Sequence, residues 1–277
     1  MASDISLTAG MRNNLMSLQN TVNLLDRTQE RLATGKKVNS ALDDPGAYFK
    51  SKALTDRSGD IGLLKDNMGQ SLQIVQSADK GIKAITAMVQ QAKALAEQAN
   101  MALAAGDTDA VSTYAIQINE LSTQIDNIVG ASGYQGINLL NAGGVNSSAA
   151  TASLDVKFES GSLRIAAVSA DSAGLSLATA NVTGANLEAV IGSLEGALST
   201  LRTSAEKLAS NLAIVQVQIS FVTDMQNVLT IGSDKLTLAD TNEEGANMLM
   251  LQTRQSLSTT ALSLSAQAAQ SVLRLFG

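Results

Sequence analysis

Two adjacent carboxylates, Asp43 and Asp44, are the residues whose type and spacing first suggest chemistry. Paired carboxylates can act as a general acid and a general base. Pro45 follows them directly, and this order is typical of a helix N-terminus, where an acidic side chain caps free backbone N–H groups and proline occupies the first turn. The sequence therefore favours a structural role for the pair, as a helix cap and a complement to the helix dipole.

The basic stretch Gly35-Lys36-Lys37 shares two residues with a phosphate-binding loop but lacks the rest of that motif. The loop requires an earlier glycine, where Glu30 stands, and a serine or threonine directly after the first lysine. The chain also has no cysteine and no histidine, which excludes cysteine nucleophiles, histidine bases and nearly all zinc sites. We therefore expect a protein that is not an enzyme and that uses no metal and no cofactor.

The composition indicates a helical protein without a nucleic-acid or membrane partner. The chain has 277 residues and a net charge of −6, whereas nucleic-acid-binding surfaces are basic. No run of about 18 apolar residues suggests membrane insertion, and the start of the chain lacks the order of a secretory signal peptide. Hydrophobic residues make up 45% of the chain and aromatics only 3%, which suits long helices joined by narrow apolar seams.

A heptad stripe of apolar residues runs from 187 to 229 and predicts one long helix packed side by side with partner helices. Similar stripes predict four more helices, at 5–33, 45–104, 108–130 and 241–277. Between the third and fourth helices, alternating apolar residues from Leu154 to Phe158 and from Leu163 to Ala167 predict a β-hairpin near 153–168, turning at Ser160-Gly161.

Polar residues and glycines mark the expected helix boundaries. Asp44 precedes the second helix, and Asp107 or Thr108 precedes the third. We expect a break after the long stripe at Gly232-Ser233, and a capping box formed by Thr241 and Glu244 at the start of the last helix. Amphipathic helices thus stand at both ends of the chain. Because a free terminal helix frays unless it is covered, we expect the two to pair with each other and with neighbouring molecules.

Three motifs make the chain resemble a bacterial flagellin. They are TQERLATGKKVNSALDD at 28–44, YQGINLL at 134–140, and ADTNEEGAN at 239–247 with its continuation to VLRLFG at 272–277. The resemblance covers about 1–140 and 186–277, and it implies a short form without outer variable domains. The implied fold is mainly α, a long helical coiled-coil rod like the D0 and D1 domains of flagellins with one small β-hairpin. The implied domains are a terminal coiled-coil domain (1–44 plus 232–277) and a helical rod domain (45–231).

This resemblance implies a structural subunit that polymerises with itself into the flagellar filament used for swimming. It further implies secretion to the filament without a cleavable signal peptide. Implied partners are other flagellins, an export chaperone, the filament cap and the hook-junction proteins. Self-assembly is expected to use one set of apolar residues from the two terminal helices: Met11, Leu15, Leu18, Val22, Leu25, Leu32, Leu251, Leu257, Leu264, Val272 and Leu275.

Some flagellins carry a segment that vertebrate innate receptors recognise through arginine, leucine and glutamate side chains. The corresponding stretch here keeps Leu95 but has Gln91 and Lys93 in place of the two arginines. Lysine does not reproduce the bidentate guanidinium fork, so we expect weak or no activation.

Two alternatives to a filament subunit remain open from the sequence. One is the hook–filament junction protein, which shares the terminal helices. The other, from a different class, is a chemoreceptor-like signalling coiled coil.

Overall fold

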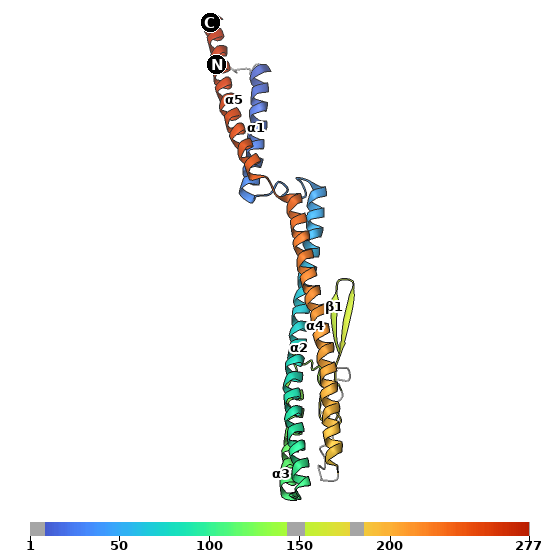
Figure 1. Ribbon diagram of the computed structural model, residues 1–277. Coiled ribbons are helices and arrows are strands. Elements are labelled where there is room, and N and C mark those ends of the chain that lie inside the picture. The colour runs from blue at the N-terminus through green and yellow to red at the C-terminus, as the bar shows by residue number, and fades with distance from the viewer. Residues whose placement is uncertain (1–8, 143–152, 178–185, 277) are drawn as a thin grey trace. The chain divides into compact units, whose positions relative to one another are not determined.

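The computed structural model describes residues 9–142, 153–177 and 186–276, with the side chains of 272–276 left undescribed. The described chain is built from long helices and one small two-stranded sheet (Figure 1). This confirms the predicted mainly α fold with a single hairpin. The elements in chain order are α1 (Ala9–Thr34), α2 (Pro45–Ala104), α3 (Thr108–Ala131), β1 (Ser153–Phe158), β2 (Gly161–Ala166), α4 (Leu187–Thr237) and α5 (Thr241–Phe276).

The acidic residues before α2 and α3 cap those helices as predicted. The Asp44 Oδ1 atom accepts a hydrogen bond of 2.9 Å from the backbone N–H of Ala47, and Pro45 is the first residue of α2. In the same way, Asp107 Oδ1 accepts one of 2.9 Å from Ala110 N–H. These bonds satisfy donors that a helix N-terminus leaves without a partner in the helix.

The predicted break at Gly232-Ser233 is wrong, because α4 continues without interruption to Thr237. Ser233 is buried, and its hydroxyl lies 2.9 Å from the hydroxyl of Ser51 on α2. Gly232 has no side chain to separate the helices, and a Cβ there would lie 3.4 Å from Leu54 Cδ1. The small residues that suggested an end are therefore the ones that let α2 approach closely.

The predicted capping box at the start of α5 is also wrong. Asp240 caps the helix instead, since its Oδ1 atom accepts hydrogen bonds of 2.9 Å from Asn242 N–H and 3.3 Å from Glu243 N–H. Thr241 is already the first helical residue. Glu244 turns away from the helix end and pairs with a residue of α1, as described below.

The described chain divides into two compact units. One comprises residues 59–226, and the other comprises residues 1–58 together with 227–277. In the 59–226 unit, α2, α3 and α4 lie side by side around an apolar core (Figure 1). The largest side chains that are fully buried in this unit are Met68, Ile82, Ile85, Ile118, Ile125, Leu139, Leu140, Ile165, Leu187, Leu194, Leu201 and Leu208.

Gly81 is the point where the chain that follows α3 packs closely on α2. A Cβ at this position would lie 2.5 Å from both Leu140 Cδ1 and Ser132 Oγ, closer than real side chains approach. Leu140 is fully buried, and Ser77 of α2 donates a hydrogen bond of 3.1 Å to the Ser132 carbonyl. Only glycine allows this approach without displacing buried atoms.

The predicted β-hairpin is confirmed with a shift of one residue in its turn. β1 and β2 are antiparallel, and Leu154 pairs with Ile165 while Val156 pairs with Leu163. Phe158 pairs with Gly161, so the turn consists of Glu159 and Ser160 rather than Ser160 and Gly161. Leu154, Val156 and Ile165 are buried, which gives the hairpin one apolar face as the alternation predicts.

Candidate assembly surfaces

In the unit of residues 1–58 and 227–277, the helices nearest the two ends of the chain pack along each other (Figure 1). The seam between α1 and α5 is narrow and partly polar. On α1 the buried residues are Met11, Thr21, Leu25 and Thr28, and on the described part of α5 they are Glu244 and Leu251. One seam of this size covers only part of the apolar surface that the two helices carry.

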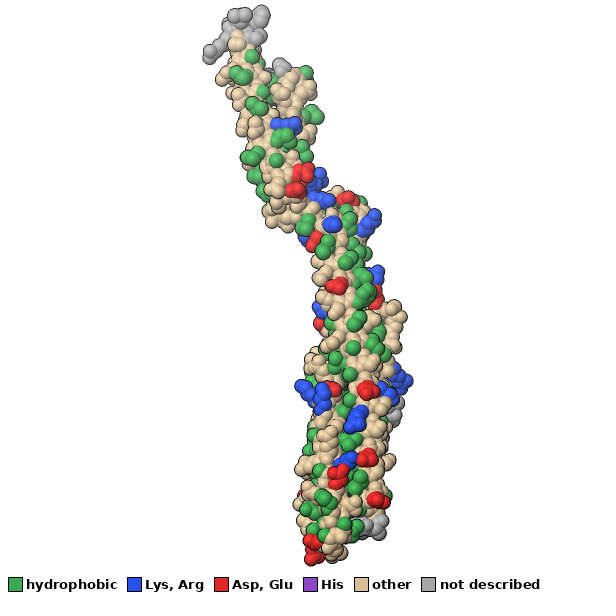
Figure 2. All heavy atoms as spheres, in the orientation of Figure 1, with side chains coloured by type: hydrophobic (Ala, Val, Ile, Leu, Met, Phe, Trp, Pro, Cys, Tyr) green, Lys and Arg blue, Asp and Glu red, His purple; other side chains and the backbone are tan. Residues whose placement is uncertain are grey.

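The opposite faces of α1 and α5 expose large hydrophobic side chains. Leu257 and Leu264 on α5 are 64% and 62% exposed, and Leu15 and Leu32 on α1 are each 37% exposed. Residues 245–271 contain one charged residue, Arg254. On the face seen in Figure 2, this pair carries few charged side chains away from its connector end. Charge-poor apolar surfaces of this kind are typical of interaction sites.

The predicted self-assembly residues therefore fall on two faces. Met11, Leu25 and Leu251 are buried and Leu18 and Val22 are half-buried, so their apolar surface is already largely used within the chain. Leu15, Leu32, Leu257 and Leu264 are exposed. Val272 and Leu275 lie in the last turns of α5, where side chains are outside the described residues.

Four exposed apolar residues of these helices are missing from the predicted set: Met16, Leu24, Leu249 and Met250. A single stripe with steps of three and four selects one face of a helix. These four residues lie beside that stripe, and a wider apolar arc would have included them.

The two connectors between the terminal helices and the rest of the chain are tied together by backbone hydrogen bonds. Lys37 N–H donates to the Thr237 carbonyl at 2.7 Å, and Ala239 N–H donates to the Gly35 carbonyl at 2.9 Å. Gly35 has a φ of +68°, a left-handed conformation that favours glycine and ends α1. The turn that ends α1 thus leads directly into a short antiparallel bridge between Lys36 and Leu238.

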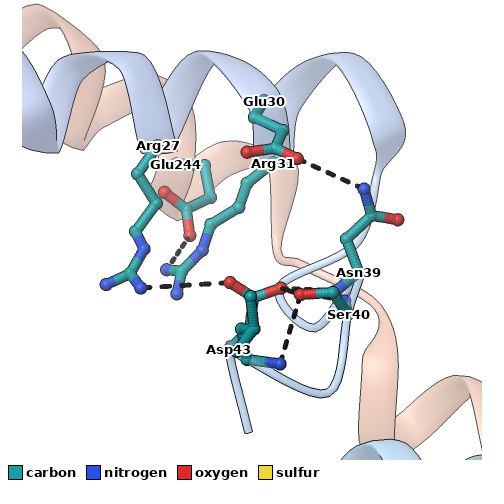
Figure 3. A network of polar contacts seen from close by, with 8 residues as sticks. Arg27, Glu30, Arg31, Asn39, Ser40, Asp43 and Glu244 are labelled. Carbon is teal, nitrogen blue, oxygen red and sulfur yellow. Dashed lines mark hydrogen bonds and ion pairs between the residues drawn. The ribbon is translucent and has the colours of Figure 1, made fainter.

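An ion pair fixes α5 on α1 beside these connectors (Figure 3). Arg31 Nη1 lies 3.0 Å from Glu244 Oε1, and the Glu244 side chain is only 10% exposed. A buried carboxylate requires a partner of opposite charge, because leaving it unpaired costs several kcal/mol. This pair could not be predicted from the sequence, since nothing in the spacing of two residues so far apart in the chain connects them.

Asp43 organises the turn before α2. Its Oδ2 atom accepts hydrogen bonds from Asn39 N–H at 3.1 Å, Ser40 N–H at 2.9 Å and the Ser40 hydroxyl at 3.1 Å (Figure 3). The backbone N–H groups of Ser40 and Asn39, then the Ser40 hydroxyl and the Arg27 charge, hold the pKa of this carboxyl below its usual value. Together with the Asp44 cap, this supports the structural interpretation of the acidic pair.

A seam of hydroxyl groups joins the start of α2 to the end of α4. The Ser233 hydroxyl lies 2.9 Å from that of Ser51 and 3.0 Å from that of Thr55. The hydroxyls of Ser58 and Thr230 are 3.4 Å apart. The pattern of apolar residues alone does not predict this seam. The signal is present, however, since serine and threonine at 51, 55 and 58 have the helical spacing of four and three.

The receptor-like segment lies on α2. Gln91 is exposed and Leu95 half-buried, and both line a groove of about 690 Å³ that also includes Gln117 and Leu121 of α3. Lys93 donates a hydrogen bond of 2.7 Å to Glu195 of α4. This bond raises the pKa of Lys93 and lowers that of Glu195. Lys93 is therefore engaged within the chain.

Within the described residues, no group of three or more acidic side chains could hold a metal ion. No helix in the described part of the chain is long and apolar enough to cross a membrane.

Comparison with known proteins defines the class. Residues 5–144 match the Bacterial flagellin N-terminal helical region, which is half of the chain. The protein therefore belongs to the flagellin family, and it is a structural subunit of a flagellar filament. Flagellins form an extracellular filament by polymerising with copies of themselves.

Two relatives align over nearly the whole of both chains, as a short flagellin requires. Flagellin FljK of Caulobacter vibrioides is 26% identical over 278 residues, which cover 98% of each protein. The flagellin of Brucella melitensis is 25% identical over 273 residues, or 95% of each. A crystal structure of Bacillus cereus flagellin is 18% identical, with a TM-score of 0.48 over 56% of this chain and 88% of that one.

Proposed function

We propose that this flagellin joins its filament through the exposed apolar faces of α1 and α5. The observation that carries the proposal is the exposure of Leu257 and Leu264 on a helix face with almost no charge. Burying one leucine side chain contributes roughly 1.5–3 kcal/mol. Several such side chains per subunit, covered by neighbouring copies, offset the entropy of ordering two helices that only one narrow seam holds together.

This surface implies separate roles in the filament for two parts of the chain. Residues 1–44 and 232–277 form the inner coiled-coil domain of the filament, and residues 45–231 form the surrounding helical domain. Met11, Leu25 and Leu251 hold α1 on α5 within one subunit, whereas Leu15, Leu32, Leu257 and Leu264 contact neighbouring subunits. The subunit acts by assembly and has no catalytic activity. An export chaperone, the filament cap, hook-junction proteins and other flagellins are the expected partners.

Seeded assembly of purified full-length protein tests the proposal. Leu257→Asp should abolish elongation from filament seeds seen by negative-stain electron microscopy, because each subunit would bury an unpaired carboxylate. Leu257→Met is the matched control and should elongate normally, since methionine keeps the apolar volume. Normal filaments from Leu257→Asp would show that this face stays exposed to solvent and would refute the proposal.

We also propose that this flagellin activates vertebrate innate receptors weakly or not at all. Gln91 offers no guanidinium, and Lys93 is engaged with Glu195, so only Leu95 of the recognised set is retained. Receptor-expressing cells exposed to the purified monomer test this proposal. A strong response at low dose would contradict it.

A further inference from the structure

The methionines in the described part of the chain differ widely in their access to solvent. Met11 and Met68 are buried, whereas Met250 of α5 is 47% exposed and Met101 of α2 is 66% exposed. Met16 on α1 is the third exposed methionine among the described residues. Because the chain has no cysteine, these methionine thioethers are the sulfur atoms available to an oxidant.

Met250 lies in line with the proposed assembly residues of α5. Steps of seven residues lead from Met250 to Leu257 and then to Leu264. Since seven residues make about two helical turns, the three side chains share one face of the helix. The next residue, Leu251, is buried in the seam with α1. The seam therefore leaves Met250 on the outer, charge-poor face of α5.

We propose that Met250 is an oxidation site that controls whether a free subunit can add to the filament. The oxidant is a peroxide, and the sulfur lone pair attacks one oxygen of hydrogen peroxide while the O–O bond breaks. The attached oxygen then passes its proton to the departing hydroxide, so the products are methionine sulfoxide and water. Sulfur loses two electrons in this step and the peroxide gains them. The inference rests on the proposed assembly role of α5 and adds a modification that regulates it.

Oxidation places one polar group in the middle of an apolar contact. The sulfoxide oxygen accepts hydrogen bonds, and burying it without a donor is unfavourable. Leu257 and Leu264 offer no donor, so an oxidised subunit binds the filament end weakly. In an assembled subunit the same contact shields the thioether, and the modification therefore acts on free subunits. Methionine sulfoxide reductases restore the thioether, which makes the block reversible.

Peroxide treatment of the full-length Met16→Leu monomer tests Met250, because Met250 and Met101 are then the exposed methionines of the described chain. The critical concentration for seeded elongation should rise at least about ten-fold after treatment. Adding Met250→Leu should abolish this rise, since leucine keeps the apolar volume and has no sulfur. Adding Met101→Leu instead is the matched control and should leave the rise unchanged. Equal rises with and without Met250→Leu would overturn the proposal.

Peptide mass spectrometry of the unsubstituted protein gives a second measure that needs no variant. Met250 should gain one oxygen in the monomer, and at least about ten-fold more slowly in filaments, because oxidation follows exposure of the thioether. Equal rates in the two states would overturn the proposal. Normal elongation of subunits whose Met250 is fully oxidised would also overturn it, and would leave the assembly role of α5 intact if Leu257→Asp still abolishes filaments. Normal filaments from Leu257→Asp would instead refute the assembly role and the oxidation proposal together.

Discussion

Arg31 and Glu244 come from opposite ends of the sequence, yet their side chains meet at 3.0 Å beside the connectors that lead to α2 and α5. Glu244 is 10% exposed and Arg31 33% exposed, so the pair is partly shielded from water. The surrounding backbone bonds, from Lys37 to Thr237 and from Ala239 to Gly35, hold the same two segments together. The ion pair thus fixes which turn of α5 packs on which turn of α1.

Removing one partner of this pair should destabilise the α1–α5 unit. Arg31→Ala leaves the Glu244 carboxylate buried without its cation, and we expect a loss of about 1–3 kcal/mol, below the full value for a buried pair because Arg31 is partly solvated. Urea unfolding of the monomer, followed by hydrogen exchange of α5 amides, measures this loss.

Arg27→Ala is the matched control for that change. Its guanidinium lies 3.9 Å from Asp43 and is 54% exposed, so its loss should cost less than about 1 kcal/mol. Equal effects of the two substitutions would mean that the Arg31–Glu244 pair contributes no more than a surface contact.

Gly81 and Gly69 both lie inside α2 but should respond in opposite directions to alanine. A Cβ at Gly81 would lie 2.5 Å from two atoms of the packed segment, so Gly81→Ala should destabilise the 59–226 unit by about 1–3 kcal/mol. At Gly69 a Cβ would meet nothing within 4 Å, and Gly69→Ala should stabilise α2 by up to about 1 kcal/mol. Thermal unfolding of the two variants would contradict this account if both changed stability in the same direction.

Asp43 should make the connector sensitive to acid. Its hydrogen bonds lower the pKa of the folded state below the ordinary value of 3.8, so the unfolded chain binds a proton more readily. The stabilisation is therefore fully present above that ordinary value and is lost as pH falls through the lowered folded pKa. Asp43→Asn should remove this part of the acid dependence, which unfolding curves of the variant and the unsubstituted protein between about pH 5 and 2 would reveal. In the unsubstituted protein, carbon-detected titration of the Asp43 carboxyl measures the lowered pKa directly.

Much of the fold follows from local patterns, whereas the contacts between distant segments do not. The stripe at 187–229 predicted α4, and alternation from Leu154 to Ile165 predicted the hairpin, although its turn lies one residue earlier than predicted. Helix ends were harder, because Gly232 and Ser233 are read as breakers when they instead allow α2 and α4 to approach closely. Apolar spacing selected candidate residues for assembly, but only the fold separates Leu251, which is buried, from Leu257, which is exposed.

The hydroxyl seam between α2 and α4 should show a non-additive response to mutation. Ser51 and Ser233 are both buried, and their hydroxyls lie 2.9 Å apart. Ser51→Ala leaves the Ser233 hydroxyl with only part of its hydrogen bonding in a site closed to water, and such a change costs about 1–3 kcal/mol. Removing both hydroxyls in Ser51→Ala/Ser233→Ala should cost less than the two single losses added together, because no unpaired group remains.

Denaturant unfolding of the two single variants and the double variant measures this coupling. Ser199→Ala, at an exposed position of α4, serves as the control and should be neutral to slightly stabilising. Additive losses in the cycle would mean that the two hydroxyls act independently, and that small size rather than hydrogen bonding explains serine at both positions. A coupled result would mean that the seam specifies how α2 and α4 are aligned, since shifting either helix would leave buried hydroxyls without partners.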